Sequence, residues 1–266
     1  RDEFNLRLNH GFQVELLEPE ALQENYRIDA PAAILSHQAA RIDPYRMAYR
    51  LLARLEKRGS PVFDRTHIAE FHATSRSVTL RTEGGQTIRA NHVVLAAGYA
   101  NQHWLKQKVA QNRSSYAFIS DPIETDTLGP LKDTMVWESA RPYLYMRSTG
   151  DGRLLIGGED DSVDVPARRD ARVEKKARIL HRKVTKLFPH LPLQLAFAWA
   201  GTFAETRDGL PFFGPHAQHG PRIHFAMAYG GNGITYSMLG ADLLRALIEK
   251  RRHPLAALFD FKRLER

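Results

Sequence analysis

The sequence of 266 residues contains no cysteine. Disulfide bonds, thiolate metal ligands and a cysteine nucleophile are therefore excluded. The same absence is compatible with a reducing compartment, and we expect a cytoplasmic protein. No run of residues approaches the ~20 consecutive apolar side chains that a membrane-spanning helix needs, so we also expect no membrane span.

The short motifs of several enzyme classes are missing as well. The chain has no G-x-S-x-G, no H-E-x-x-H and no phosphate loop of the G-x-x-x-x-G-K-[ST] kind. The dinucleotide motif G-x-G-x-x-G is incomplete, because its nearest match, 231–236, ends in tyrosine. Three histidines lie close together, at His216, His219 and His224. Their spacing is not that of a zinc motif, and we expect no metal site.

An acidic segment follows an apolar run near the middle of the chain. It contains Glu159, Asp160, Asp161 and Asp164. Such a segment could supply the paired carboxylates of a glycosidase, or it could be a solvent-exposed turn. We favour the exposed turn.

The formal net charge is +8 at pH 7, which is compatible with a nucleic-acid or anionic partner. Much of this charge comes from residues 168–188. Apolar residues recur there in alternating steps of four and three, at Val173, Ala177, Leu180, Val184 and Leu187. That spacing predicts an amphipathic helix whose Arg and Lys side chains cover a solvated face. We therefore expect no nucleic-acid partner.

The first hundred residues predict an alternation of helices and strands. A short helix is expected over 14–25 and a longer one over 41–59, where Asp43 is the N-cap and Pro44 the first helical residue. A strand within 60–73, a hairpin over 77–90 that turns at its two glycines, and a buried strand within 91–101 that runs into a small-residue turn follow. This order is typical of the later half of a dinucleotide-binding α/β unit.

The middle of the chain has a different pattern. Three strands are expected between 114 and 160, the last two joined by a turn at 149–152, and then come the basic helix and a strand within 195–206. A helix lying on an antiparallel sheet indicates a second, α+β layer inserted into the first.

A glycine-rich joint lies near the end of the chain. An apolar run at 225–229 predicts a buried strand, and the helical spacing after 235 predicts a helix. Between them are Gly230, Gly231 and Gly233. Glycines at a helix N-terminus let a ligand approach the unpaired backbone N–H groups, although a tight turn that binds nothing has the same pattern.

Three segments in this order resemble the flavin-dependent D-amino acid oxidase superfamily, which includes glycine oxidase and sarcosine oxidase. They are V-V-L-A-A-G at 93–98, W-A-G-x-x-x-x-T-x-D-G-L-P-F-F-G at 199–214 and Y-G-G-N-G-I-T at 229–235. The resemblance extends over nearly the whole chain. Members of the family begin with a strand, a G-x-G-x-x-G turn and a helix that hold the FAD pyrophosphate. We interpret the chain as the C-terminal portion of such a protein, and we expect it to be inactive alone.

The resemblance implies an α/β flavin-binding domain, of which the Rossmann-like part is incomplete, with an inserted α+β antiparallel-sheet substrate domain. The partial FAD-binding domain would comprise 27–112 and 199–266, and the substrate domain 1–26 and 113–198. The implied activity is hydride transfer to FAD from a carbon bearing the nitrogen of an amino acid or secondary amine, with oxygen or an unknown acceptor. The alternatives are a hydroxy acid, a polyol phosphate or a modified RNA base as substrate, or a non-catalytic fragment without flavin.

The resemblance also suggests site residues, although it assigns no catalytic residue. The implied flavin contacts are Ile68, Ala97, Gly98, Tyr229, Gly230, Gly231, Asn232, Gly233, Ile234 and Thr235. The candidates for the substrate pocket are Tyr143, Tyr145, Phe203, Glu205 and Arg141. Phe203 and Gly231 stand where glycine oxidase has arginines that contact the substrate carboxylate, so Arg141 or Arg147 is expected to take over that role.

Overall fold

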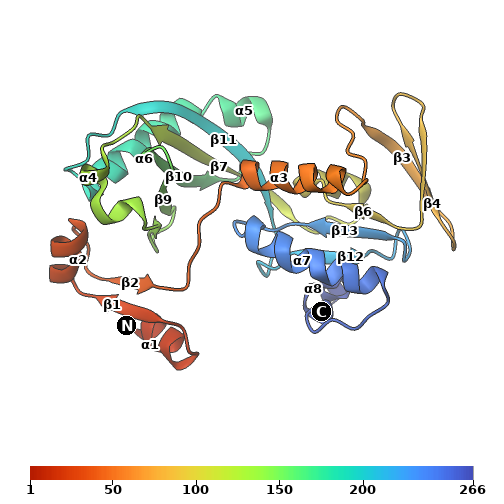
Figure 1. The fold of residues 1–266 in the computed structure, drawn as a ribbon, viewed down its shortest axis with the longest axis horizontal. Coiled ribbons are helices and arrows are strands. Elements are labelled where there is room, and N and C mark those ends of the chain that lie inside the picture. The colour runs from red at the N-terminus through yellow and green to blue at the C-terminus, as the bar shows by residue number, and fades with distance from the viewer. Residues whose placement is uncertain (266) are drawn as a thin grey trace. The chain divides into compact units, whose positions relative to one another are not determined.

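The structure is a computed structural model that describes residues 1–265. It divides into two compact units (Figure 1). Unit 1 comprises Arg1–Ile42 and Ser114–Gly201, and unit 2 comprises Asp43–Arg113 and the residues from Thr202 onward. Residues 27–42 thus belong to unit 1. The separate roles expected for a substrate domain and an FAD-binding domain stay predictions.

Unit 1 is built on a five-stranded sheet with the strand order β11-β7-β10-β9-β8. Its strands are β7 (Gln111–Ser120), β8 (Val136–Trp137), β9 (Leu144–Ser148), β10 (Leu154–Asp161) and β11 (Leu195–Glu205). Helix α6 (Val173–Leu187) covers one face, where Ala177, Leu180 and Val184 are buried. The amphipathic spacing therefore predicted this helix and its buried stripe correctly.

The remaining parts of unit 1 are short. They are α1 (Asp2–Asn9), β1 (Val14–Leu17), α2 (Pro19–Tyr26), β2 (Ala33–Ser36), α4 (Thr125–Leu128), the 3-10 turn η2 (Gly129–Lys132) and α5 (Pro166–Asp170). The helix predicted over 14–25 is wrong at its start. Val14–Leu17 pairs antiparallel with β2, and the helix begins only at Pro19, a residue favoured in the first helical turn.

Unit 2 begins with α3 (Pro44–Lys57). The Asp43 carboxylate accepts a hydrogen bond from the Arg46 N–H at 3.0 Å, so the predicted N-cap is confirmed. An antiparallel sheet follows, formed by β3 (Ile68–Ala73), β4 (Val78–Thr82) and β5 (Thr87–Ala90). The hairpin turns at the predicted glycines, and Gly85 has the positive φ of +82° that such a turn needs.

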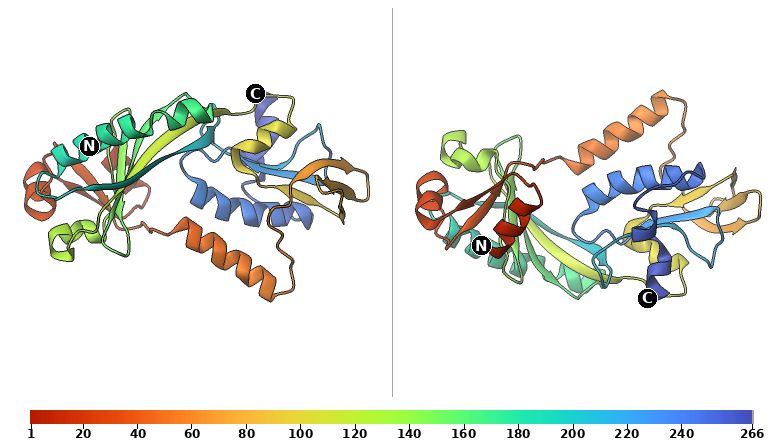
Figure 2. Two further views of the ribbon diagram at one scale, coloured as in Figure 1. Left: turned by 90° about the horizontal axis from the view of Figure 1, so that it is seen from above. Right: turned by 90° about the horizontal axis from the view of Figure 1, so that it is seen from below.

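A second sheet in unit 2 has the order β12-β13-β6. It comprises β6 (Val93–Leu95), β12 (Phe212–Pro215) and β13 (Ile223–Met227), of which β13 is buried throughout. Val94 is exposed, so β6 is not the fully buried strand predicted. The long helix α7 (Gly233–Ile248) lies along this sheet (Figure 2). Its Leu243 and Leu244 are buried against Phe213. Short helices η1 (Gly98–Trp104), α8 (Ala256–Phe259) and η3 (Phe261–Glu265) complete the unit.

None of the helices that the structure describes has the length and apolar character required to cross a membrane.

Candidate functional site

The carboxyl ends of two parallel strands meet at one edge of unit 2. Strand β13 runs parallel to β6, with Ile223 opposite Val93 and Phe225 opposite Leu95. After β6 the chain continues through 97–98 into η1, and after β13 it continues through 229–235 into α7. In open α/β sheets, ligands bind outside the carboxyl ends of parallel strands. Nine of the ten predicted flavin contacts therefore lie at one such edge.

A single buried side chain joins the two strand ends. The Asn101 amide nitrogen donates to the Leu95 carbonyl at 2.8 Å and to the Ala226 carbonyl at 3.1 Å. Its amide oxygen accepts a hydrogen bond from the Ala97 N–H at 3.3 Å. Sequence reasoning missed Asn101, because its partner on β13 lies 125 residues away and only a polar residue after a small-residue turn marks it.

The glycine joint leaves the start of α7 open. Gly230 has a φ of +56° and donates its N–H to the Ala204 carbonyl, which fixes the turn. The Asn232 side chain makes no capping bond. No residue in the described part of the chain accepts a hydrogen bond from the N–H groups of residues 231, 233, 234 or 235. A Cβ built on Gly231 would meet nothing within 4 Å. The positive end of the helix dipole is therefore accessible to an anionic group.

Two of the predicted flavin contacts, Tyr229 and Ile68, are partly buried. The Tyr229 ring lies 5.7 Å from the Phe213 ring, centroid to centroid, and burial raises its pKa. Ile68, at the start of β3, packs against the core beneath β6 and β13. Tyr229 therefore supports the joint from the core side.

Phe203 and Glu205 lie near the end of β11, in unit 2. The Glu205 carboxylate pairs with the Arg113 guanidinium, at 2.6 Å between Oε2 and Nε. A pocket of about 600 Å³ opens beside this pair. It is lined by Lys108, Val109, Ala110, Gln111, Arg113, Glu205, Thr206, Arg207 and Gly209. The sequence did not predict the arginine partner of Glu205.

The predicted tyrosines form a pair in unit 1. The Tyr143 and Tyr145 rings are 5.8 Å apart, centroid to centroid, and the Arg141 guanidinium lies 5.1 Å from the Tyr143 ring centroid. The Tyr145 ring lies across Gly157 of β10, where an added Cβ would come within 2.3 Å of the phenol oxygen. Burial raises the pKa of both phenols. Arg141, Tyr143 and Tyr145 thus belong to unit 1, whereas Phe203 and Glu205 belong to unit 2.

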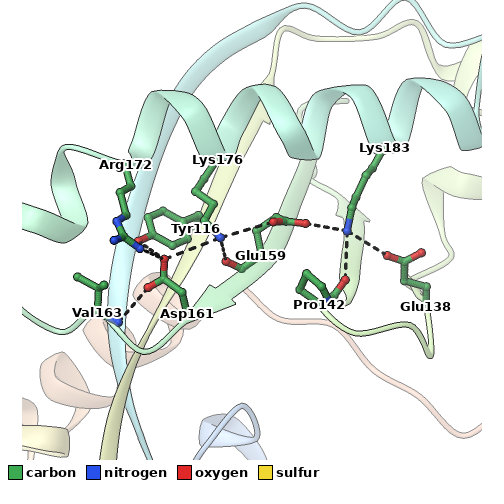
Figure 3. Close-up of polar contacts among 9 residues, drawn as sticks. All are labelled: Tyr116, Glu138, Pro142, Glu159, Asp161, Val163, Arg172, Lys176 and Lys183. Carbon is green, nitrogen blue, oxygen red and sulfur yellow. Dashed lines mark hydrogen bonds and ion pairs between the residues drawn. The ribbon is translucent and has the colours of Figure 1, made fainter.

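The acidic segment is not the exposed turn that its composition predicted. Glu159 is only 6 % exposed, and its carboxylate lies 2.7 Å from Lys183 Nζ and 3.5 Å from Lys176 Nζ (Figure 3). Gly158 and Glu159 have φ values of +138° and +55°, and the register of β10 shifts between Gly158 and Asp161. This bulge directs Glu159 toward α6. The prediction that the Arg and Lys side chains of the basic helix are solvated is therefore wrong for Lys176 and Lys183.

Asp161 extends the same network. Its carboxylate lies 2.9 Å from Arg172 Nη1 and accepts a hydrogen bond from the Tyr116 hydroxyl at 3.1 Å (Figure 3). Burial and the Asp161 charge raise the pKa of Tyr116 to about 12. Burial would raise the pKa of Asp161 too, but the Val163 N–H and Arg172 outweigh it and hold that pKa below its usual value. Asp161 is therefore a carboxylate at neutral pH.

The three clustered histidines do not form a metal site in the described residues, which contain no group of three potential ligands placed around one point. His224 is buried on β13, with its Nε2 3.2 Å from His92 Nδ1. Burial, together with His92, lowers the pKa of His224 to about 4, so this imidazole is neutral at pH 7.

A family model described as FAD dependent oxidoreductase (DAO) matches residues 1–247. The chain belongs to this family. Both the predicted family and the predicted fold are confirmed, and FAD is the cofactor on which the family depends.

The relatives of this chain include two glycine oxidases and one bifunctional protein. Glycine oxidase of Geobacillus kaustophilus is 29 % identical over 196 residues, covering 73 % of this chain and 49 % of the relative. Glycine oxidase of Bacillus subtilis is 25 % identical over 217 residues, covering 78 % and 54 %. A tRNA 5-methylaminomethyl-2-thiouridine biosynthesis bifunctional protein MnmC of Cupriavidus necator is 27 % identical over 179 residues, covering 58 % and 26 %. The chain spans about half the length of the glycine oxidases it matches.

Solved structures show the same fold. L-proline dehydrogenase from P. horikoshii superposes with a TM-score of 0.83 at 20 % identity, covering 98 % of this chain and 71 % of that one. Glycine oxidase from Geobacillus kaustophilus has a TM-score of 0.81 at 21 % identity, covering 98 % and 70 %. At these identities the likeness establishes the fold of the chain.

The edge between β6 and β13 fits part of the family's cofactor. Its open N–H groups suit an electron-rich ring edge, and the absence of side chains at Gly231 and Gly233 leaves room for a flat ligand. A complete G-x-G-x-x-G does not occur in the sequence. No residue of the chain is therefore assigned to the pyrophosphate.

Proposed function

We propose that this chain carries the flavin-ring and substrate contacts of an enzyme that oxidises a C–N bond of a small amine or amino acid. The observation that supports this most directly is the open N-terminus of α7 beside the ends of two parallel strands. When bound, FAD supplies the acceptor for a hydride removed from the carbon next to the nitrogen. The names of the relatives, glycine oxidase and L-proline dehydrogenase, agree with an amine substrate.

In this proposal, residues of the joint stabilise negative charge. The N–H groups of Gly231, Gly233 and Thr235 donate to the electron-rich edge of the ring, and a hydrogen bond to a charged group contributes about 1.5–3 kcal/mol. Asn101 keeps the two strand ends together, which holds the donors in place before the ligand arrives. Arg141 is the proposed partner of a substrate carboxylate, because arginine can contact both oxygens at once.

The test replaces Gly231 by valine in the flavin-loaded protein. A branched side chain at this open position should obstruct the ring, so we expect the flavin content, measured from absorbance, to fall while the fold is kept. Gly150→Val is the matched control, because Gly150 also has open space around it and no positive φ. Equal flavin contents in the two variants would contradict the placement.

A substrate screen tests the chemistry itself. Glycine, sarcosine and proline are added to the flavin-loaded protein without oxygen, and bleaching of the flavin absorbance is followed. We expect at least one amine to bleach the flavin, whereas hydroxy acids and polyol phosphates should not. Bleaching only by the latter compounds would refute C–N oxidation. Peroxide formation after oxygen is admitted would then identify an oxidase.

The 266 residues alone are proposed to bind added FAD weakly and to be inactive, because no residue among them forms a complete dinucleotide motif. Quenching of FAD fluorescence measures this. Tight binding by the isolated chain would show that the phosphates have another site within it.

A second candidate substrate is an amine carried by a modified tRNA base. The MnmC relative and the net charge of +8 favour it. Flavin bleaching by tRNA that carries an alkylaminomethyl uridine, but not by unmodified tRNA, would support this candidate over a free amino acid.

A further inference from the structure

The pocket beside Arg113 and Glu205 is lined by two segments of unit 2 that are far apart in the sequence. Its volume of about 600 Å³ is within the range of small-molecule sites. The first wall consists of residues between 108 and 113, where the chain enters β7. The second wall consists of residues between 205 and 209, where the chain leaves β11. Both walls therefore belong to the ends of strands that are neighbours in one sheet.

The lining of this pocket is positively charged. Lys108, Arg113 and Arg207 are three cations against the single carboxylate of Glu205, which gives a net charge of +2. Lys108 and Arg207 are exposed, and neither forms an ion pair with a residue that the structure describes. Asp208, the residue after Arg207, pairs with Arg263 instead, at 2.6 Å between Oδ2 and Nε. Two of the three cations therefore have no counter-ion within the described part of the chain.

The third cation has hydrogen-bond donors that the chain leaves unused. Arg113 Nε donates to Glu205 Oε2 at 2.6 Å, whereas Nη1 and Nη2 donate to no described residue. The two Nη atoms of a guanidinium can contact two oxygens of one anion at once. Because Glu205 holds the guanidinium at Nε, the edge formed by Nη1 and Nη2 is available to a ligand.

Side chains with internal hydrogen bonds hold both walls in place. The Gln102 Oε1 atom accepts a hydrogen bond from the Val109 N–H at 2.9 Å, and its Nε2 donates to the Gln107 carbonyl at 2.9 Å. These bonds fix the first wall. In the second wall, the buried Thr206 donates its hydroxyl to the Leu210 carbonyl at 2.8 Å. The cations are thus carried on backbone that is ordered before a ligand arrives, which lowers the entropic cost of binding.

We propose that this pocket binds a phosphate monoester, or inorganic phosphate, as a dianion. Two negative charges balance the net charge of +2, and three phosphate oxygens provide acceptors for the Arg113 fork, Lys108 and Arg207. A carboxylate or a phosphodiester carries one charge only and leaves the lining positive. Each phosphorus of FAD is also singly charged, so the site is distinct from one for the flavin pyrophosphate. The inference goes beyond the oxidation of an amine and does not depend on it.

The probe is methyl phosphate, and the matched probe is dimethyl phosphate, which has the same tetrahedral group with one charge fewer. A phosphate monoester has a second pKa of about 6, so methyl phosphate is a dianion at pH 8. Binding to the 266-residue chain is measured by titration calorimetry and by phosphorus NMR at constant ionic strength. We expect methyl phosphate to bind at least tenfold more tightly than dimethyl phosphate.

Two results of these titrations would overturn the proposal. Equal binding of the two esters would show that the pocket does not select a dianion, and would favour a phosphodiester such as an RNA backbone. Displacement of methyl phosphate by added FAD would assign the pocket to the cofactor. We expect inorganic phosphate to displace methyl phosphate and FAD to leave it bound.

Substitutions in the two walls locate the binding. Lys108→Gln and Arg207→Gln should each weaken methyl phosphate binding severalfold, and the double variant at least tenfold. Lys106→Gln is the matched control, because Lys106 is exposed in the same loop, carries the same charge and does not line the pocket. Arg113→Gln should cost at least tenfold, and the double variant provides the test if Arg113→Gln fails to fold. Unchanged binding in the double variant, or equal losses in Lys108→Gln and Lys106→Gln, would overturn the proposal.

Discussion

Neutralising Glu159 should destabilise unit 1 markedly. The carboxylate is 8 % exposed as a side chain, and its lysine partners Lys176 and Lys183 are 17 % and 35 % exposed. Removing one member of a buried ion pair costs about 3–5 kcal/mol, because the partner charge is left uncompensated. The Lys183 side chain is about one-third exposed, so water can solvate its charge when the carboxylate is removed. We therefore expect Glu159→Gln to lower the free energy of unfolding by roughly 2–3 kcal/mol.

The measurement is urea unfolding followed by circular dichroism, and thermal unfolding gives a second value. A loss of this size corresponds to a fall in Tm of roughly 5–10 °C for a chain of this length. Glu174→Gln is the matched control, because Glu174 forms an i,i+4 pair with Arg178 and its side chain is 82 % exposed. Such exposed pairs contribute about 0.3–0.5 kcal/mol.

The comparison with the control decides the result. If Glu159→Gln lowers the free energy of unfolding no more than Glu174→Gln does, the network of Figure 3 does not stabilise the fold and the reasoning is refuted. A double variant that also replaces Lys183 by methionine should recover part of the loss, because the uncompensated Lys183 charge is removed and Lys176 keeps Asp161 as a partner. Glu138, which also pairs with Lys183, is 37 % exposed as a side chain, so water can solvate its charge.

Three further predictions concern other parts of the chain. Asn101→Ala should lower the free energy of unfolding by about 2–4 kcal/mol in urea titrations, because the buried Ala226 carbonyl and the partly buried Leu95 carbonyl lose their donor. A loss below ~0.5 kcal/mol would contradict the role of Asn101 in joining the strands. The pKa of Asp161 is lowered in the folded state, so the stabilisation that its carboxylate provides is present above the unfolded pKa of 3.8 and is lost as the pH falls through the lower folded pKa. Between pH 6 and pH 2, the free energy of unfolding should therefore fall less steeply in Asp161→Asn than in the unchanged protein. Parallel curves for the two proteins would disprove this prediction. Gly240→Ala should cost about 1–3 kcal/mol, because the new Cβ would lie 2.1 Å from the Phe213 ring; an unchanged Tm would show that the ring moves aside freely.

Local signals in the sequence predicted the elements that depend on local structure. The Asp43–Pro44 start of α3 is an interaction within one helical turn, and the apolar stripe of α6 is a periodicity within one helix. The glycine joint was found for the same reason, since strand, glycines and helix are contiguous.

The features that sequence reasoning missed depend on distant partners. Val14–Leu17 is a strand because Ala33–Ser36 pairs with it, and the composition of the first segment alone fits a helix equally well. Glu159 is buried because a positive φ turns it toward lysines 17 and 24 residues further along, a conformation that a non-glycine residue rarely adopts. The assignment of Tyr143 and Tyr145 to a substrate pocket and of the joint to flavin stays a prediction until ligand binding is measured.

Helix α3 has a capping hydrogen bond at its N-terminus but no buried residue, and this affects how readily proteases cleave the chain. None of its 14 residues is buried in the part of the chain that the structure describes, and Tyr45 and Tyr49 are largely exposed. Isolated helices of this length are only marginally stable in water, so the Asp43 cap and the contact between the two tyrosine rings provide much of what keeps it folded. The free energy of opening α3 is then far below that of global unfolding. Limited proteolysis should first cleave the chain within 44–57, and any molecule that covers the apolar side of α3 would slow this cleavage in proportion to its occupancy.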